Sequence, residues 1–246
     1  MVVVNYVDIT NIDYELYYFF KKLVSKTRQK KADQYRFFDD AKRCVFSDLL
    51  LQYSFFQKVG SLNEIEMAYN EFGKPFIPGG KNFLYNISHS GKWVVVAYAE
   101  VPVGVDIEKI YTDQENMPIE FFTSEERAYI NAAVSDERAE RFTQTWTLKE
   151  SYVKYIGTGL STNLNSFSIL MDDRIKVKKG NGIQEEIRLE SQLFQTEYYL
   201  SICSVDEEIK IHEISLIDLI DFAHNKKKVN EAQIIPNEMN KVVRRR

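Results

Sequence analysis

The chain has 246 residues, enough for one large core or two small ones packed together. Its formal net charge of −4 argues against general nucleic-acid binding, which usually needs a basic surplus to release counterions from phosphates. No apolar run reaches the length of a membrane span, and the first ten residues lack the features of a secretion signal. Cys44 and Cys203 give neither a disulfide framework nor zinc-like spacing. We therefore expect a cytoplasmic globular protein that binds neither nucleic acid nor membrane.

Periodicity predicts the elements of the first half. Apolar residues alternate in the strands and recur at helical spacing in the helices. The region 26–43 is locally basic, and the glycines and prolines of 72–80 indicate a loop. We expect strands at 2–7, 83–88 and 93–99, the last two forming a hairpin, and helices at 14–25 and 39–58.

The second half repeats this mixture of helices and short strands. A strand at 103–108 precedes a helical stretch at 119–155, which contains a capping segment at 123–126. Further strands are expected at 165–170, 174–178, 183–189, 198–203 and 209–214. The element order predicts two similar α+β lobes, 1–104 and 105–225, followed by a solvated basic tail at 226–246.

Three carboxylates and a lysine are spaced as they would be in a metal-phosphate site. Asp106 and Glu108 are one residue apart in an alternating strand, so both leave the same face. Glu150 and Lys154 are one helical turn apart, so both lie on one side of a helix. Such an all-oxygen set suits magnesium, which is commonly completed by waters and substrate phosphates. Each segment alone is equally typical of a solvated strand or an exposed helix.

Four motifs in one order resemble the Sfp-type 4′-phosphopantetheinyl transferase family. They are Phe-Gly-Lys-Pro at 72–75, Asn-Ile-Ser-His-Ser at 86–90, Gly-Val-Asp-Ile-Glu at 104–108 and Trp-Thr-Leu-Lys-Glu-Ser-Tyr-Val-Lys at 146–154. The similarity runs from about residue 28 to residue 160. It implies an α+β fold of two similar α+β lobes in a pseudo-twofold arrangement, acting as a monomer.

The resemblance implies an enzyme of the holo-[acyl-carrier-protein] synthase type. Such an enzyme transfers the 4′-phosphopantetheine arm of coenzyme A to a serine of an acyl or peptidyl carrier protein and releases 3′,5′-ADP. The carrier is expected to bind near the cleft, through apolar residues and basic charge after Gly157. The sequence does not say which carrier is served or whether acyl-coenzyme A is accepted.

The family motifs also assign roles to individual residues. Asp106, Glu108 and Glu150 should hold magnesium, and Lys154 should neutralise phosphate charge. His89 should donate a hydrogen bond to the 3′-phosphate or the pyrophosphate. The catalytic set is Glu150, Lys154 and His89; the coenzyme-binding set is Arg28, Lys31, Arg43, Lys74, Pro75, Ser88, His89 and Lys154.

Several alternatives remain open at this level. The proton acceptor for the carrier serine could be Glu150, a metal-bound water or Glu126. An exposed basic helix face would equally explain Arg28 and Lys31, and Trp146, Phe121 and Phe122 are expected to be core residues. A metal-dependent hydrolase of nucleotide pyrophosphates and a coenzyme-A-binding scaffold are the rival functions.

Overall fold

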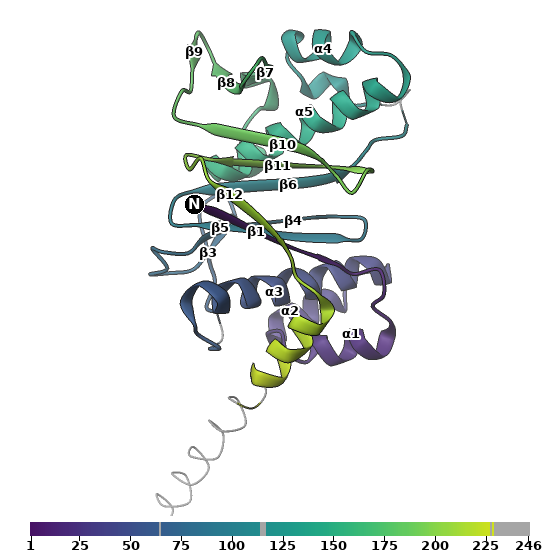
Figure 1. Cartoon of the computed structure of the whole chain (residues 1–246), viewed down its shortest axis with the longest axis vertical. Helices are drawn as coiled ribbons and strands as arrows, with labels where there is room; N and C mark the ends of the chain where they lie inside the picture. The colour runs from purple at the N-terminus through teal and green to yellow at the C-terminus, as the bar shows by residue number, and fades with distance from the viewer. Residues whose placement is uncertain (64, 114–116, 227, 229–246) are drawn as a thin grey trace, which may run out of the picture.

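The computed structural model describes residues 1–63, 65–113, 117–226 and 228. Figure 1 shows sheets in the middle of the molecule, with one set of helices below them and another above. The predicted α+β fold class is confirmed. Most of the expected basic tail lies outside the described residues. Within them, no helix is both long and apolar enough to cross a membrane.

The first lobe places three helices against one face of a sheet. The predicted helix at 14–25 is in fact two short helices, because Asp13 and Ser25 each cap a separate helix start. The elements are β1 (Val2–Asp8), α1 (Tyr14–Lys21), α2 (Lys26–Ala32), α3 (Phe38–Val59), β2 (Ala68–Tyr69), β3 (Pro75–Phe76), β4 (Leu84–Ser90) and β5 (Trp93–Ala99).

The second lobe repeats the pattern of a long helix across antiparallel strands. The predicted cap at 123–126 is a complete capping box, in which Thr123 and Glu126 each accept from the other's backbone N–H. The elements are β6 (Val103–Lys109), α4 (Ser124–Asn131), α5 (Ser135–Ile156), β7 (Phe167–Met171), β8 (Ile175–Lys179), β9 (Gly182–Ile183), β10 (Arg188–Phe194), β11 (Tyr198–Ser204) and β12 (Ile209–Glu213). The strand expected at 183–189 is wrong in its bounds, because 184–187 form a turn between β9 and β10.

The two long helices, α3 and α5, are counterparts. Each has 22 residues and ends at a glycine with positive φ, 74° at Gly60 and 75° at Gly157. A left-handed residue at this position is the usual way to end a helix, and glycine adopts it without steric cost. The helix α3 packs mainly on β5, whereas α5 packs on β6 and β11.

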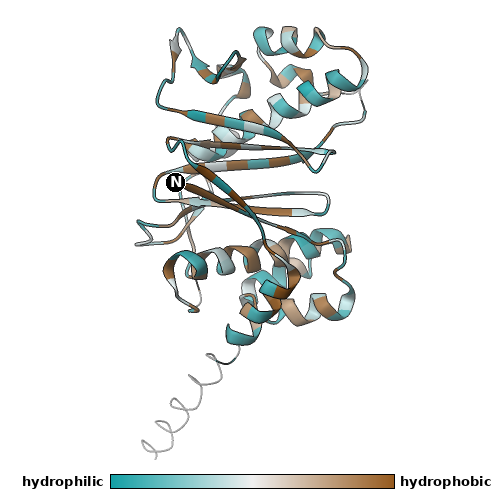
Figure 2. Cartoon of the chain, viewed as in Figure 1, coloured by the Kyte–Doolittle hydropathy of each residue, from teal (hydrophilic) through white to brown (hydrophobic). Residues whose placement is uncertain are grey.

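Two sheets meet at the centre of the molecule. One has the strand order β12-β1-β5-β4, and the other has the order β10-β11-β6. Between them lies a core that includes Val4, Val95, Val105, Ile107 and Leu200. Figure 2 shows hydrophobic residues concentrated along these central strands.

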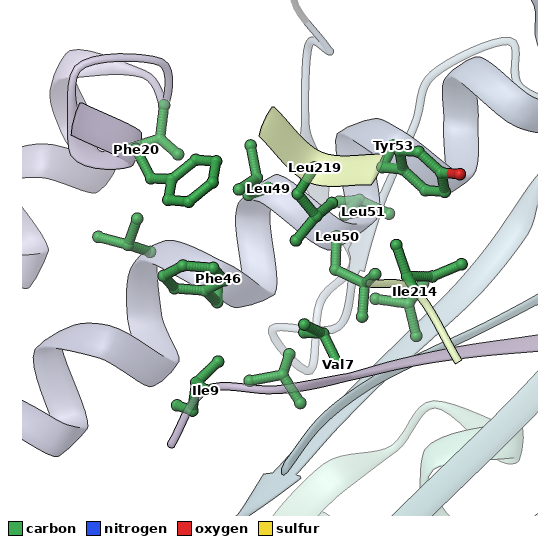
Figure 3. Packing of buried hydrophobic residues seen from close by; sticks show 14 of the residues in the cluster. Val7, Ile9, Phe20, Phe46, Leu49, Leu50, Leu51, Tyr53, Ile214 and Leu219 are labelled. Carbon is green, nitrogen blue, oxygen red and sulfur yellow. The ribbon is translucent and has the colours of Figure 1, made fainter. Parts of the chain in front are cut away.

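The chain returns to the first lobe at its C-terminal end. The strand β12 pairs in parallel with β1, and the helix at 216–226 follows it. Ile214 and Leu219 pack beside Leu50 and Leu51 of α3 (Figure 3). The last part of the range expected to belong to the second lobe therefore packs on the first, a long-range contact that local periodicity does not encode.

Candidate active site

A cavity of about 820 Å³ lies where the two lobes meet. Its lining comes from β6 and α5 of the second lobe and from α2, α3, β4 and the β2–β3 hairpin of the first, with β4 and β6 side by side. Its polar and charged lining residues are Ser25, Thr27, Arg28, Lys31, Ser47, Ser88, His89, Asp106, Glu108, Glu150 and Lys154. The cavity therefore has an acidic side and a cationic side, which suits a ligand carrying several phosphates.

Side chains join the two central sheets beside this cavity. The strands β4 and β6 are neighbouring edges but belong to different sheets, so no backbone ladder connects them. Instead, three alternate side chains of β4 accept hydrogen bonds from three alternate backbone N–H groups of β6. Asn86 accepts from Val105 at 2.9 Å, Ser88 from Ile107 at 3.3 Å, and Ser90 from Lys109 at 3.1 Å.

The two serines of this seam also hold the strand carboxylates. The Ser88 hydroxyl donates to Asp106 Oδ1 and the Ser90 hydroxyl donates to Glu108 Oε2, both at 2.8 Å. Asp106 and Glu108 both line the cavity, as the alternation of the strand predicts. The motif Asn-Ile-Ser-His-Ser therefore fixes the carboxylates of the neighbouring motif.

A glycine lets α5 approach β6 closely. A Cβ atom at Gly104 would lie 2.0 Å from the carbonyl oxygen of Ser151 and 2.5 Å from the backbone nitrogen of Tyr155. Only glycine fits such an approach without moving the helix. The absent side chain therefore sets the distance at which Glu150 and Lys154 face Asp106.

Lys154 bridges the two motifs. Its ammonium group donates to Asp106 Oδ1 at 2.6 Å, to Ser88 Oγ at 3.0 Å and to the Val105 carbonyl at 3.2 Å. Asp106 is 3% exposed, and its second oxygen, Oδ2, is buried without a hydrogen-bond partner. A buried carboxylate oxygen without a partner is unfavourable, and a cation or a hydrogen-bond donor beside it would relieve that cost.

The three carboxylates perturb one another. Burial and the negative charge of Asp106 raise the pKa of Glu108 to about 7, and the same two causes raise the pKa of Glu150. Among the described residues, no three acidic, histidine or cysteine side chains already close around a metal position. Magnesium does not require such a closed cage, because waters and substrate phosphates commonly complete its coordination.

Comparison with known sequences bears on what such a cavity binds. Two family models match consecutive parts of the chain: the N-terminal 4′-phosphopantetheinyl transferase model over 13–101 and the 4′-phosphopantetheinyl transferase superfamily model over 102–203. The 4′-phosphopantetheinyl transferase gsp of Aneurinibacillus migulanus is 34% identical over 196 residues, which are 79% of this chain and 81% of that protein. The chain belongs to the 4′-phosphopantetheinyl transferase family.

Within this family the chain is of the Sfp type. The 4′-phosphopantetheinyl transferase Sfp of Bacillus subtilis (strain 168) is 34% identical over 152 residues, covering 61% of this chain and 67% of that protein. Among solved structures, a holo-(acyl-carrier-protein) synthase from Bacillus anthracis covers 42% of this chain and 94% of its own. Its TM-score of 0.35 and sequence identity of 21% are too low to support an inference about the site.

Most of the residues that the transferase motifs suggested do meet at the cavity. His89 is exposed, and its pKa is lowered by partial desolvation and by the nearby cations of Arg43 and Lys154. The sequence-suggested residues found in the cavity lining are Arg28, Lys31, Pro75, Ser88, His89, Asp106, Glu108, Glu150 and Lys154.

Arg43 and Lys74 are engaged elsewhere. Arg43 donates to the Gly91 carbonyl at 2.7 Å and to Asp40 at 2.5 Å, and it is not among the residues that line the cavity. The Lys74 ammonium donates to the carbonyls of Lys154 and Tyr155 at the C-terminal end of α5. A long flexible side chain can bind any acceptor that the fold brings near it. The sequence motif does not specify which acceptor that is.

Glu126 does not reach the cavity. It is 1% exposed and accepts from the ammonium group of Lys149 at 2.7 and 2.9 Å, with additional donors from the Thr123 and Ile169 backbones. This geometry contradicts a role for Glu126 as the proton acceptor, because every acceptor contact faces the interior. Glu126 instead forms a structural ion pair with Lys149.

The aromatic expectations are only partly correct. Phe122 is fully buried, as predicted, whereas Phe121 is 44% exposed. Trp146 lines the cavity and also a smaller cavity of about 260 Å³ beside Glu108. The expectation that Trp146 packs in the core is confirmed, because it packs against the cluster of Phe122 and Phe142, but its role at the cavity was not expected. Helical spacing indicated which face of α5 carries Trp146, but it did not indicate that this face also borders a cavity.

Sequence reasoning assigned no role to several residues of the site. Asn86 and Ser90 belong to the Asn-Ile-Ser-His-Ser motif. Because they are four residues apart on a strand, their side chains lie on the same face, and this spacing could have identified them. Gly104 was likewise inside a motif, but the helix that it accommodates lies more than forty residues further along the chain. Thr27 and Ser47 gave no signal at all.

Proposed function

We propose that this 4′-phosphopantetheinyl transferase binds coenzyme A in the cavity between its lobes and acts there on a carrier-protein serine. The observation that carries the proposal is the pairing of three carboxylates and Lys154 on one wall with Arg28 and Lys31 on the other. Coenzyme A has a pyrophosphate and a separate 3′-phosphate, so it needs charge neutralisation at two places. Arg28 and Lys31 take the 3′-phosphate, and the carboxylate wall takes the pyrophosphate.

Asp106, Glu108 and Glu150 would hold magnesium at the carboxylate wall. The free Oδ2 of Asp106 and the raised pKa values of Glu108 and Glu150 support this assignment, since a divalent cation relieves all three. When bound, the ion supplies Lewis-acid stabilisation of the pyrophosphate oxygens. Lys154 neutralises a further phosphate oxygen while remaining anchored to Asp106.

Glu150 accepts the proton of the carrier serine. It lines the cavity beside the two strand carboxylates that would hold magnesium, where the carrier serine would approach the pyrophosphate. The serine oxygen forms a bond to the β-phosphorus, the pyrophosphate P–O bond breaks, and 3′,5′-ADP leaves with the bonding pair. His89 donates a hydrogen bond to phosphate from its edge of the cavity.

The acceptor is an acyl or peptidyl carrier protein, and the enzyme acts as a monomer. Both lobes of one chain supply walls of the cavity, so one copy contains every residue assigned here. Holo-[acyl-carrier-protein] synthase activity is the corresponding reaction on an acyl carrier.

The test is the intact mass of an apo carrier domain after incubation with enzyme, coenzyme A and magnesium. The wild type should add one phosphopantetheine unit, and Glu150→Gln should slow the reaction by about 10³-fold, the usual weight of a general base. Glu137→Gln is the matched control, because Glu137 lies on the same helix in an exposed pair with Arg141. An unmodified carrier with hydrolysed coenzyme A would indicate a hydrolase instead, and one with bound but intact coenzyme A would indicate a scaffold.

A further inference from the structure

A buried carboxylate stands behind the cationic wall of the cavity. Asp48 of α3 is 4% exposed, and its Oδ1 lies 3.5 Å from Nε of Arg28 on α2. One helical turn earlier, the Cys44 sulfur accepts from Nη1 of Arg28 at 3.9 Å. The helix α3 thus engages one edge of the guanidinium while Arg28 lines the cavity.

The second oxygen of Asp48 leads to the C-terminal helix. Gln52, one turn further along α3, donates from Nε2 to Asp48 Oδ2 at 2.5 Å. The Gln52 carbonyl in turn accepts from the ammonium group of Lys226, which is 5% exposed at the end of the 216–226 helix. The sequence analysis placed Lys226 in a solvated tail, and its burial corrects that expectation.

The helix at 216–226 is held in place by apolar packing, which fixes Lys226 beside Gln52. Leu219 is buried in the first-lobe core (Figure 3). Phe222 is buried there too, with its ring 5.6 Å from that of Tyr53. A cavity of about 250 Å³ runs along Asp48, Gln52 and Lys226 and shares lining residues with the coenzyme cavity. The network and the coenzyme cavity are therefore adjacent.

A buried carboxylate is unfavourable unless cations and donors satisfy it. Asp48 has Arg28 on one side, and Gln52 and Lys226 on the other. The contact with Lys226 also orients the Gln52 amide, because only its carbonyl can accept and only its amino group can donate to Asp48. Each side chain in the series Lys226, Gln52 and Asp48 thus orients the next one. The series ends at the guanidinium group of Arg28.

We infer that Asp48 is a positioning residue that holds the Arg28 guanidinium for the 3′-phosphate of coenzyme A, and that Gln52 and Lys226 hold Asp48. This inference rests on the proposed contact between Arg28 and that phosphate. An arginine fixed before the ligand arrives loses less side-chain freedom on binding, so its phosphate contact contributes more to affinity. The C-terminal helix is thereby part of the coenzyme site without touching the coenzyme.

The competing explanation is that Asp48 only neutralises Arg28 for folding. Removing the carboxylate would then leave Arg28 more electropositive, and phosphate binding would stay the same or tighten. The two explanations predict opposite changes in affinity, so equilibrium binding separates them.

The experiment is calorimetric titration of the full chain with coenzyme A and, separately, with 3′-dephospho-coenzyme A. The wild type should prefer coenzyme A. In Asp48→Asn the affinity for coenzyme A should fall about tenfold and that for the dephospho form by less than about twofold, a typical effect of breaking a coupled contact. Lys226→Met should act in the same direction by about threefold, and Lys228→Met, exposed two residues further along the chain, is the matched control.

Each failure has its own signature. A wild type without preference for coenzyme A contradicts the proposed phosphate site itself. A wild-type preference that is unchanged or greater in Asp48→Asn overturns the positioning role while leaving the transferase intact. If Asp48→Asn does not fold, Lys226→Met decides: preference equal to that of the Lys228→Met control overturns the inference. In an Arg28→Met background, Lys226→Met should no longer alter the preference.

Discussion

Two neighbouring residues of α5 belong to two different kinds of charged site, one a buried ion pair and the other a cluster of carboxylates at the cavity. Lys149 points into the second lobe, where it and Glu126 are each no more than 1% exposed and fully hydrogen-bonded to each other and to the backbone. Glu150, the next residue, points into the cavity, where it shares a raised pKa with Glu108 and faces Asp106 with its free Oδ2. The same helix thus contributes to a satisfied Lys149–Glu126 ion pair on one side and to an unsatisfied carboxylate cluster on the other.

The difference separates structural charges from binding charges. A buried ion pair with complete hydrogen bonds is stable only while both partners remain, because either one alone is an uncompensated charge. A cluster of carboxylates with too few cations is unfavourable in the free protein and becomes favourable when a cation arrives. Substitutions should therefore destabilise the first site and leave the fold around the second intact.

The largest effect is expected at the ion pair. Lys149→Met should lower the free energy of unfolding by about 3–5 kcal/mol, because it leaves Glu126 buried without its cation. Adding Glu126→Leu should recover part of that loss, since no charge stays buried, whereas the backbone N–H groups of Thr123 and Ile169 lose their acceptor. Chemical denaturation of the two variants checks this, and a double variant no more stable than Lys149→Met would contradict it.

The next effect is expected at the approach of α5 to β6. Gly104→Ala should lower stability by about 2 kcal/mol, because its Cβ meets the Ser151 carbonyl and the helix must shift. The rate of phosphopantetheine transfer should fall by more than the loss of folded protein explains, because Glu150 moves with the helix. Gly182→Ala is the control, since its Cβ would meet nothing nearer than 3.9 Å. Equal transfer rates in these two folded variants would refute the close-approach explanation.

Magnesium should stabilise the protein more at high pH than at low pH. The native pKa of Glu108 is about 7, above its ordinary value of 4.5, so this group's contribution to stability falls as pH rises from about 5 to about 7. Magnesium binds the ionised form and restores that loss. The rise in Tm on adding magnesium should be about 3 °C larger at pH 8 than at pH 6, the shift that roughly 1 kcal/mol produces in a chain of this size. Glu108→Gln should reduce the pH dependence to the part that Glu150 contributes, and a pH-independent rise in the wild type would count against this site.

The smallest effect is expected at the seam between the sheets. Ser90→Ala removes the hydroxyl that holds Glu108 and should weaken magnesium binding about fivefold, or roughly 1 kcal/mol. Calorimetry with magnesium measures it, with the exposed Ser166→Ala as control. Equal affinities would mean that the seam joins the sheets without setting the carboxylates.

Local patterns predicted the parts of the site that a single element determines. Strand alternation correctly placed Asp106 and Glu108 on one side, and helical spacing did the same for Glu150 and Lys154. The capping box at Thr123 and the two long helices also followed from local rules. These features depend on residues within a few positions of one another.

What local patterns missed depends on distant partners. The contacts of Lys74 with the end of α5 and of Lys226 with Gln52 join segments 80 or more residues apart. The parallel pairing of β12 with β1 has the same origin. Glu126 stayed open as one of three candidate proton acceptors because a buried ion pair and a catalytic carboxylate look alike in one sequence; only the position of Lys149 distinguishes them.

The most direct test is the free energy of unfolding of Glu126→Gln and Glu150→Gln, measured side by side by denaturant at pH 8 without magnesium. The account predicts opposite signs: Glu126→Gln loses about 3–5 kcal/mol, whereas Glu150→Gln is as stable as the wild type or more stable, because it removes a charge that Asp106 repels. A loss of similar size in both variants would contradict the division of α5 into a structural side and a binding side.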